Sequence, residues 1–220
     1  RQIKDLLADP TGIPDAGNAA ADTIRGVMSQ LNDTEQAHSP LWTSRSLQRG
    51  MEVLRAPFDE TKTAAKKLGG TLNTAFLTAA AEAAGNYHRE LGSPVDELRA
   101  SMAISTRTDD SGSNAFSLAR MMVPTGDMPI ADRFRTIQAA TGAAREASAG
   151  GSLEALAAVA ASLPTSLVTR LARQQAQTVD FATSNVRGAP MPMFVAGAQL
   201  LENYPVGPLG GVAFNLTLLS

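Results

Sequence analysis

TLNTAFLTAAAEAAGNYHRELGSPVDELRASMAIST, residues 71–106, holds the clearest helix of the chain and one of the strands that decide its fold. Apolar residues recur at spacings of three and four through 72–90, which predicts a helix with one apolar face and Thr71 as its N-cap. That face is predicted to consist of Leu72, Ala75, Phe76, Ala79, Ala80, Ala83 and Tyr87. Residues 98–106 are predicted to be a strand. The segments on either side decide how this helix and strand are combined.

The flanking segments carry similar local signals. Further helices are predicted at 1–9, 18–31, 58–68, 129–147 and, in two pieces broken near Pro164, at 153–176. Further strands are predicted at 46–56, 115–123, 178–185, 193–200 and 212–219. This order fits neither a regular alternation of strands and helices nor an all-β fold. It favours an α/β protein of the two-layer α+β kind, with a mixed sheet and helices packed on one face.

Composition narrows the class of protein. The chain has 220 residues, 44% of them hydrophobic, and a net charge of −2, so nothing points to nucleic acid. It has no cysteine, which excludes disulfides, thiolate metal sites and cysteine nucleophiles and fits a cytosolic protein. No apolar run reaches the 18 residues of a membrane span. Both ends look abrupt, so we expect a part of a longer protein.

Familiar catalytic motifs fit poorly. The glycines of VGPLGG (206–211) lack the strand–loop–helix order of a phosphate loop, and Ser184 lacks the helix of a nucleophile elbow. Adjacent Asp109 and Asp110 read as a solvated turn. We expect no metal site, since the only histidines are His38 and His88. His38 lies in a polar loop and is a weak catalytic candidate, whereas His88 is predicted to be a partly exposed imidazole near a helix C-terminus.

Two stretches remain with a functional interpretation. In DFATSNVRGAP (180–190), a buried-strand pattern ends on the small polar residues Ser184 and Asn185, which raises the question of what their side chains contact. In 153–176, leucines and valines form an apolar stripe flanked by Arg170 and Arg173. This stripe is predicted to pack on the sheet. A surface for lipid or membrane contact is the alternative.

Five stretches occur in a characteristic order. They are SPLWTSRSL (39–47), LGGTLNTAFLTAAAEA (68–83), LRASMAISTRTDD (98–110), TSNVRGAP (183–190) and AGAQLLENYPVGPLGGVAFNLTLLS (196–220). Together they resemble the bacterial wax ester synthase/acyl-CoA:diacylglycerol acyltransferase family. The resemblance covers most of the chain from about residue 39 and is to the latter part of such proteins.

The resemblance implies a fold and a reaction. The family's fold is similar to that of chloramphenicol acetyltransferase, in which two related halves face each other across a tunnel. Its first half carries a His-His-x-x-x-Asp-Gly motif whose second histidine is the general base, and this chain has no such motif. We therefore expect no catalytic residue here, a base in a preceding half, and substrate-binding roles for Asn73, Ser184 and Asn185. Acyl-CoA is expected as a substrate, with no cofactor.

Two positions depart from the family pattern. The family usually has Asn-Asp where this chain has Asn73-Thr74, and Thr74 can accept a hydrogen bond at the helix start but carries no charge. The family more often has proline where Arg187 stands, and proline would stiffen the exit from the strand. Both departures leave open a change of substrate or a loss of activity.

The expected organisation follows. Residues 1–45 are a linker with helices from the junction with a preceding half, and 46–220 are a C-terminal acyltransferase domain cut at both ends. The full protein is expected to move a fatty acyl group from acyl-CoA to diacylglycerol or a long-chain alcohol. The alternatives are a non-catalytic lipid-binding homologue and a condensation-type enzyme that uses a carrier-protein thioester. We expect a cytoplasmic location, with peripheral contact at membranes or lipid droplets left open.

Overall fold

A computed structural model describes residues 37–44, 48, 50–105, 116–147, 165–166, 169, 177–207 and 211–220. The helices that lie fully within these residues are α3 (Phe58–Lys67), α4 (Leu72–Glu90) and α5 (Ile130–Ala147). The strands are β1 (Glu97–Ser105), β2 (Phe116–Pro124), β3 (Phe181–Val186), β4 (Phe194–Val195), β5 (Ala198–Gln199) and β6 (Phe214–Leu219). The helices predicted at 1–9 and 18–31 lie outside the described residues. So does most of 153–176, of which 165–166 and 169 are helical.

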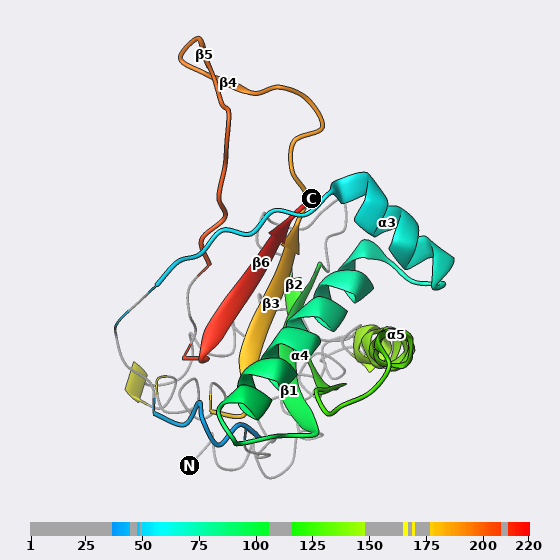
Figure 1. The fold of residues 1–220 in the computed structure, drawn as a ribbon. Coiled ribbons are helices and arrows are strands. Elements are labelled where there is room, and N and C mark those ends of the chain that lie inside the picture. The colour runs from blue at the N-terminus through cyan, green and yellow to red at the C-terminus, as the bar shows by residue number, and fades with distance from the viewer. Residues whose placement is uncertain are drawn as a thin grey trace, which may run out of the picture.

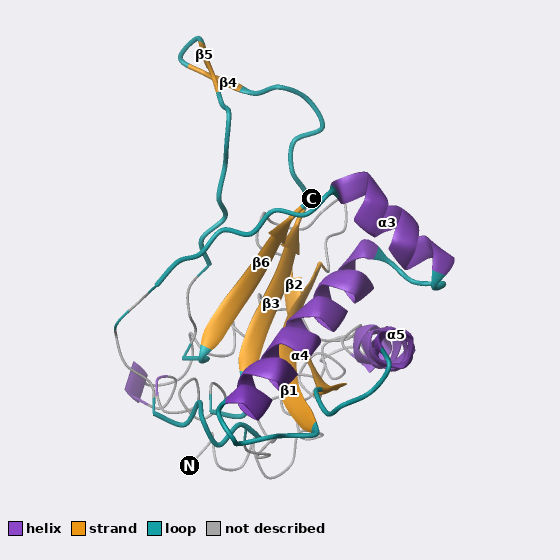
Figure 2. Ribbon diagram, in the orientation of Figure 1, coloured by secondary structure: helices purple, strands orange, loops and turns teal. Residues whose placement is uncertain are grey.

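The main sheet has four strands in the order β2-β1-β3-β6. β1 pairs with β2 in antiparallel orientation, while β1–β3 and β3–β6 are parallel pairs. The helices lie on one face of this sheet (Figures 1 and 2). The prediction of an α+β fold, with a mixed sheet and helices on one face, is therefore confirmed.

The hydrophobic core lies between this sheet and the helices α4 and α5. Alternate residues of β1, namely Leu98, Ala100 and Met102, point into it together with Phe181 of β3. Across from them, α4 contributes Leu77 and several alanines. The small alanines let the helix backbone approach the sheet closely, and Gly85 extends this approach to the loop after β2. A Cβ built on Gly85 would lie 2.1 Å from the Thr125 carbonyl oxygen.

Local chemistry sets the ends of α3 and α4, and Thr71 is the N-cap of α4 as predicted. α3 has acidic residues in its first turn and lysines in its last, which suits the helix dipole. Gly69 follows it with φ of +78°, a conformation that favours glycine. At the start of α4, the Thr71 hydroxyl accepts from the Thr74 amide at 3.2 Å, and Thr74 Oγ1 accepts from the Thr71 amide at 3.4 Å. This reciprocal pair is a capping box.

The buried face of α4 differs from the predicted one. Ala79, Ala83 and Tyr87 of the predicted apolar stripe are exposed. The buried residues are Asn73, Thr74, Leu77, Thr78, Ala80, Ala81, Ala84, Gly85 and His88. The prediction was wrong by about one residue because the polar members of this face all find partners inside the protein. Helix spacing alone cannot show such partners.

Two segments that were predicted to be strands have other structures. Residues 48 and 50–56, the described part of the predicted strand 46–56, form no helix or strand and are exposed. Residues 193–200 form a tight hairpin instead of one strand, because Ala196 and Gly197 both have positive φ and reverse the chain between β4 and β5. The other described strands and helices lie within three residues of their predicted bounds.

Candidate functional site

The three predicted substrate-binding residues lie at one end of the sheet. β1, β3 and β6 run parallel, so their C-terminal ends share one edge, and Ser184 and Asn185 lie near the end of β3. Asn73 lies at the start of α4, and its Nδ2 donates to Met102 Sδ at 3.2 Å in the second half of β1. The structure thus brings all three residues to the C-terminal edge of the sheet.

Asn73 is nevertheless buried in the helical layer. The residue is 9% exposed, and its side-chain amide is used in the contact with the Met102 sulfur. This contact ties the first turn of α4 to β1. Next to it, the fully buried Thr74 donates a hydrogen bond from its hydroxyl to Gln138 Oε1 of α5. In this structure, the pair at the start of α4 therefore joins three elements of the fold.

Ser184 and Asn185 lie on opposite faces of the sheet, because successive side chains of a strand alternate. Asn185 shares its face with Phe181 and Thr183, the helical side, and it is exposed. Its Oδ1 accepts from Ser220 Oγ at 3.2 Å. Ser184 is partly buried on the other face and pairs with Thr217 of β6. A single ligand could contact both side chains only at the rim of the sheet.

Backbone hydrogen bonds fix the exit from β3. The Ser220 amide donates to the Val186 carbonyl at 3.0 Å, and the Gly188 amide donates to the Ser220 carbonyl at 2.6 Å. These two bonds flank Arg187, whose own side chain is exposed. A proline at 187 would remove neither bond. The path of the chain here is thus held by β6, with or without a proline ring.

The opposite end of the sheet, where β1 and β3 begin, carries a buried carboxylate. Asp180, fully buried just before β3, accepts three backbone N–H groups. They come from Arg99 at 2.7 Å, Ser39 at 2.8 Å and His38 at 3.1 Å. Each bond to a charged acceptor contributes more than an ordinary hydrogen bond. Asp180 therefore fixes the 37–44 segment to the start of β1 and β3.

His88 belongs to the same anchor, and its predicted partial exposure was wrong. It is fully buried, with Nδ1 donating to the Ala84 carbonyl at 2.7 Å. In the neutral ring this leaves Nε2 to accept from the Ser39 hydroxyl at 2.8 Å. The Ser39 oxygen also accepts from the Trp42 amide, and the Trp42 ring packs edge-on to His88 at 4.6 Å between centroids. Both ring nitrogens are therefore occupied.

His38 is exposed and lies at the Asp180 edge, where it lines a shallow pocket with Val95, Asp96, Glu97 and Pro124. It is therefore at the opposite edge of the sheet from Ser184 and Asn185. Within the described ranges, no cluster of His, Asp and Glu is placed to hold a metal ion. No helix in this part of the chain is long and apolar enough to cross a bilayer.

Sequence reasoning missed the anchor made by Asp180, Ser39 and His88. The signal that could have indicated it is an aspartate directly before a predicted buried strand, since a buried carboxylate needs several donors. Asp109 and Asp110 lie outside the described residues, as do Arg170 and Arg173 with the stripe of 153–176.

The fold is of a known class. It is similar to the structure of the wax ester synthase/diacylglycerol acyltransferase from Marinobacter aquaeolei VT8, with a TM-score of 0.52 over 94% of this chain and 48% of that one. The two sequences are 19% identical, so this likeness bears on the fold alone. Residues 112–220 match the family model of the WS/DGAT C-terminal domain.

Residues 112–220 therefore belong to the wax ester synthase/diacylglycerol acyltransferase family, as the resemblance indicated. A protein of Mycobacterium tuberculosis H37Rv that is named as a diacylglycerol O-acyltransferase is 31% identical over 184 residues, covering 83% of this chain and 37% of that protein. A second M. tuberculosis protein with the same kind of name is 26% identical over 210 residues, covering 90% and 43%. The chain thus spans less than half the length of these relatives.

Proposed function

We propose that this chain is the C-terminal part of an O-acyltransferase that moves a fatty acyl group from acyl-CoA to diacylglycerol or a long-chain alcohol. The observation that carries the proposal is the match of residues 112–220 to the WS/DGAT C-terminal domain. Two relatives named as diacylglycerol O-acyltransferases support it, since their similarity extends over most of the chain.

In the proposed reaction, the acceptor hydroxyl oxygen attacks the thioester carbonyl carbon. The carbon–sulfur bond breaks, an ester forms, and the thiol of coenzyme A leaves with the proton that the hydroxyl lost. The general base is proposed to lie in a preceding half of the protein. His88 is unsuited to that role because it is buried with both ring nitrogens occupied, and His38 lies at the wrong edge of the sheet.

The chain's own contribution is proposed to be a wall of the substrate site. Ser184 and Asn185 present a hydroxyl and an amide at the C-terminal rim of the parallel strands, and Asn185 is exposed. Such groups can orient a polar acceptor headgroup or the thioester by hydrogen bonds without filling a channel. Asn73 is proposed to act through packing, because its amide contacts the Met102 sulfur. No cofactor is proposed beyond the acyl-CoA substrate.

We propose a cytoplasmic location. Peripheral contact at membranes or lipid droplets is proposed because both substrates are lipids. A non-catalytic lipid-binding homologue is the second candidate, motivated by the departures at Thr74 and Arg187 and by the apolar stripe in 153–176. Of these, Thr74 gives it little support, since the threonine completes the capping box without a charge.

The test is acyl transfer by purified full-length protein. Palmitoyl-CoA is supplied with dioleoylglycerol or hexadecanol, and the ester and the free thiol are measured together. The proposal expects both products in equal amounts. A full-length protein that binds palmitoyl-CoA but forms no ester with either acceptor would favour the lipid-binding candidate. Transfer from a carrier-protein thioester but not from palmitoyl-CoA would favour a condensation-type enzyme.

A further inference from the structure

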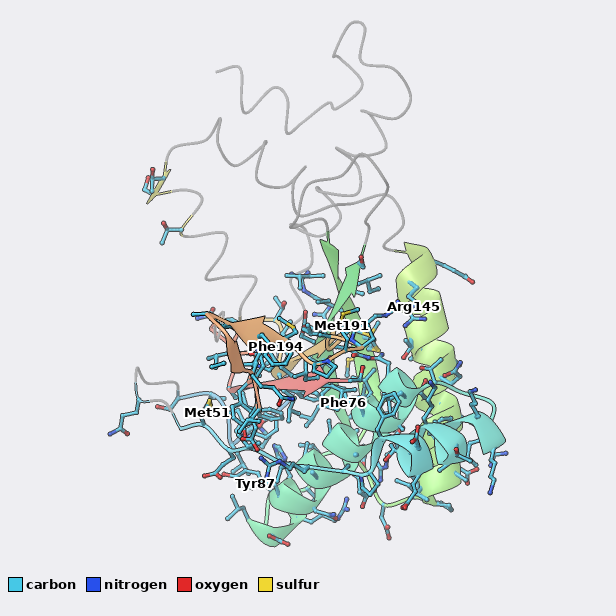
Figure 3. The ribbon with its side chains drawn as sticks, turned by 90° about the horizontal axis from the view of Figure 1, so that it is seen from above. Met51, Phe76, Tyr87, Arg145, Met191 and Phe194 are labelled. Carbon is cyan, nitrogen blue, oxygen red and sulfur yellow. The ribbon has the colours of Figure 1, made fainter. Side chains whose placement is uncertain are left out.

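The C-terminal edge of the sheet is almost free of charge. The strand ends and the first turn of α4 that meet there are the described segments 71–74, 102–105, 116–118, 183–190 and 214–220. Arg187 is the only charged residue among them. Figure 3 looks onto this end of the molecule, with Phe194 of the β4–β5 hairpin in front of the strands and Tyr87 of α4 on the helical side. The proposed substrate rim therefore carries a single charge of its own, and that charge is positive.

The backbone around Arg187 is fixed, while its side chain is not used. The Ser220 amide donates to the Val186 carbonyl and the Gly188 amide donates to the Ser220 carbonyl, so β6 holds the residues on both sides of Arg187. The side chain is exposed and, among the described residues, takes part in no ion pair, hydrogen bond or ring contact. Its guanidinium donors are thus available to a partner from outside this part of the chain.

Arginine is not the residue that local stability favours at this position. A proline would keep both flanking hydrogen bonds and would restrict the unfolded chain, and the family more often has proline here. Proteins depart from the locally stable choice mainly at functional sites. The arginine therefore indicates a partner that carries negative charge.

The proposed substrates differ in charge. Diacylglycerol and long-chain alcohols are neutral, whereas the coenzyme A part of the donor carries a pyrophosphate and a 3′-phosphate. The planar guanidinium group of arginine pairs with phosphate through two parallel hydrogen bonds. In open α/β sheets, ligands bind outside the carboxyl ends of the parallel strands, which is where Arg187 lies. Of the proposed substrates, only the donor can use this charge.

We propose that Arg187 binds a phosphate group of the acyl-CoA donor and makes the protein selective for coenzyme A thioesters over donors without phosphate. The inference rests on the proposed acyl transfer. Arg187 acts on donor binding and takes no part in the proton transfer or in the breaking of the carbon–sulfur bond. Its loss should therefore raise KM for the donor and leave kcat nearly unchanged. A contact with a carboxylate of a preceding half is the competing role, and it would affect every donor alike.

The first experiment measures the binding of coenzyme A to the full-length protein by isothermal titration calorimetry. Arg187→Gln removes the charge, Arg187→Lys keeps it, and Arg135→Gln at an exposed arginine of α5 is the matched control. We expect Arg187→Gln to weaken binding about three- to tenfold, with a smaller effect at high salt, while Arg187→Lys keeps most of the affinity and the control all of it. The proposal would be overturned by absent binding in the unmodified protein or by unchanged binding in Arg187→Gln. An effect on phosphatidylcholine–phosphatidylglycerol vesicles but not on coenzyme A would also overturn it.

The second experiment compares palmitoyl-CoA with S-palmitoyl-pantetheine, a thioester that lacks the phosphates. With dioleoylglycerol or hexadecanol as acceptor, we expect Arg187→Gln and Arg187→Pro to raise KM for palmitoyl-CoA about three- to tenfold and to leave KM for the pantetheine thioester unchanged. The proline variant should show this loss although it is expected to be the more stable protein. An equal loss with both donors would identify a structural role, at the rim or against the preceding half, and would overturn the proposal. If neither donor yields an ester, the proposed function fails, while the binding of coenzyme A still decides the role of Arg187.

Discussion

Replacing Asp180 should release the 37–44 segment from the sheet. The carboxylate accepts the amides of Arg99 and His38 on Oδ2 and that of Ser39 on Oδ1. In Asp180→Asn, the amide oxygen can keep the two bonds on the Oδ2 side, but the amide nitrogen then faces the Ser39 N–H. One bond to a charged acceptor is lost and two donors oppose each other, which costs about 2–3 kcal/mol. Asp180→Ala leaves all three amides without this acceptor and should cost about 4 kcal/mol, since the 37–44 segment can then open to water.

Hydrogen exchange of the full-length protein measures this local opening. In Asp180→Asn the peptide that contains 37–44 should exchange roughly 30- to 150-fold faster, because about 1.4 kcal/mol corresponds to a factor of ten. Asp127→Asn is the matched control, since Asp127 is exposed. If Asp180→Ala left exchange of this peptide as slow as in the control, the reasoning about the anchor would be refuted.

Three further substitutions test the packing and the local chemistry. Gly85→Ala places a Cβ 2.1 Å from the Thr125 carbonyl oxygen and should lower the free energy of unfolding by about 2 kcal/mol or more. Its control, Gly142→Ala in α5, has open space around the new Cβ and should raise the free energy of unfolding by about 0.5–1 kcal/mol. Equal effects of the two variants in urea denaturation would contradict the close approach of α4 to Thr125. Thr74→Val removes one half of the capping box and the bond to Gln138, so about 1–2 kcal/mol should be lost, against less than about 0.5 kcal/mol for the exposed Thr136→Val. Arg187→Pro removes neither flanking hydrogen bond and should raise the free energy of unfolding by about 0.4–1 kcal/mol, whereas Arg187→Ala should not raise it. A lower free energy of unfolding in the proline variant would show that the exit from β3 depends on the Arg187 amide.

The elements that local chemistry decides were predicted from the sequence. The bounds of α4 agree with the prediction because Thr71 and Thr74 signal the helix start within three residues of each other. Likewise the charges of α3 and the position of Gly69 are local signals. The sheet strands β1, β2, β3 and β6 lie near their predicted ranges because their apolar residues are continuous or alternate in the sequence.

What the sequence left undetermined depends on distant partners. The buried face of α4 includes His88, which is paired with Ser39 from 49 positions earlier, and Asn73, which is paired with Met102. The contacts of Asp180 span up to 142 positions. Residues 50–57 and 189–204 show a different limit of prediction from the sequence. Their apolar patterns indicate surfaces that must be covered, but a pattern cannot tell whether the cover comes from this chain or from another part of the protein.

Asn185 tests the proposed substrate wall. It is exposed, and among the described residues its side chain accepts a hydrogen bond from the Ser220 hydroxyl at 3.2 Å, so Asn185→Ala should change the free energy of unfolding by less than about 0.5 kcal/mol. Losing a hydrogen bond to substrate worth about 1–2 kcal/mol should lower kcat/KM for palmitoyl-CoA transfer by roughly 5- to 30-fold. Asn86→Ala, at an exposed asparagine on α4, is the matched control and should keep full kcat/KM. Full turnover in folded Asn185→Ala protein would contradict the assignment of the β3 and β6 rim as a wall of the acyl-transfer site.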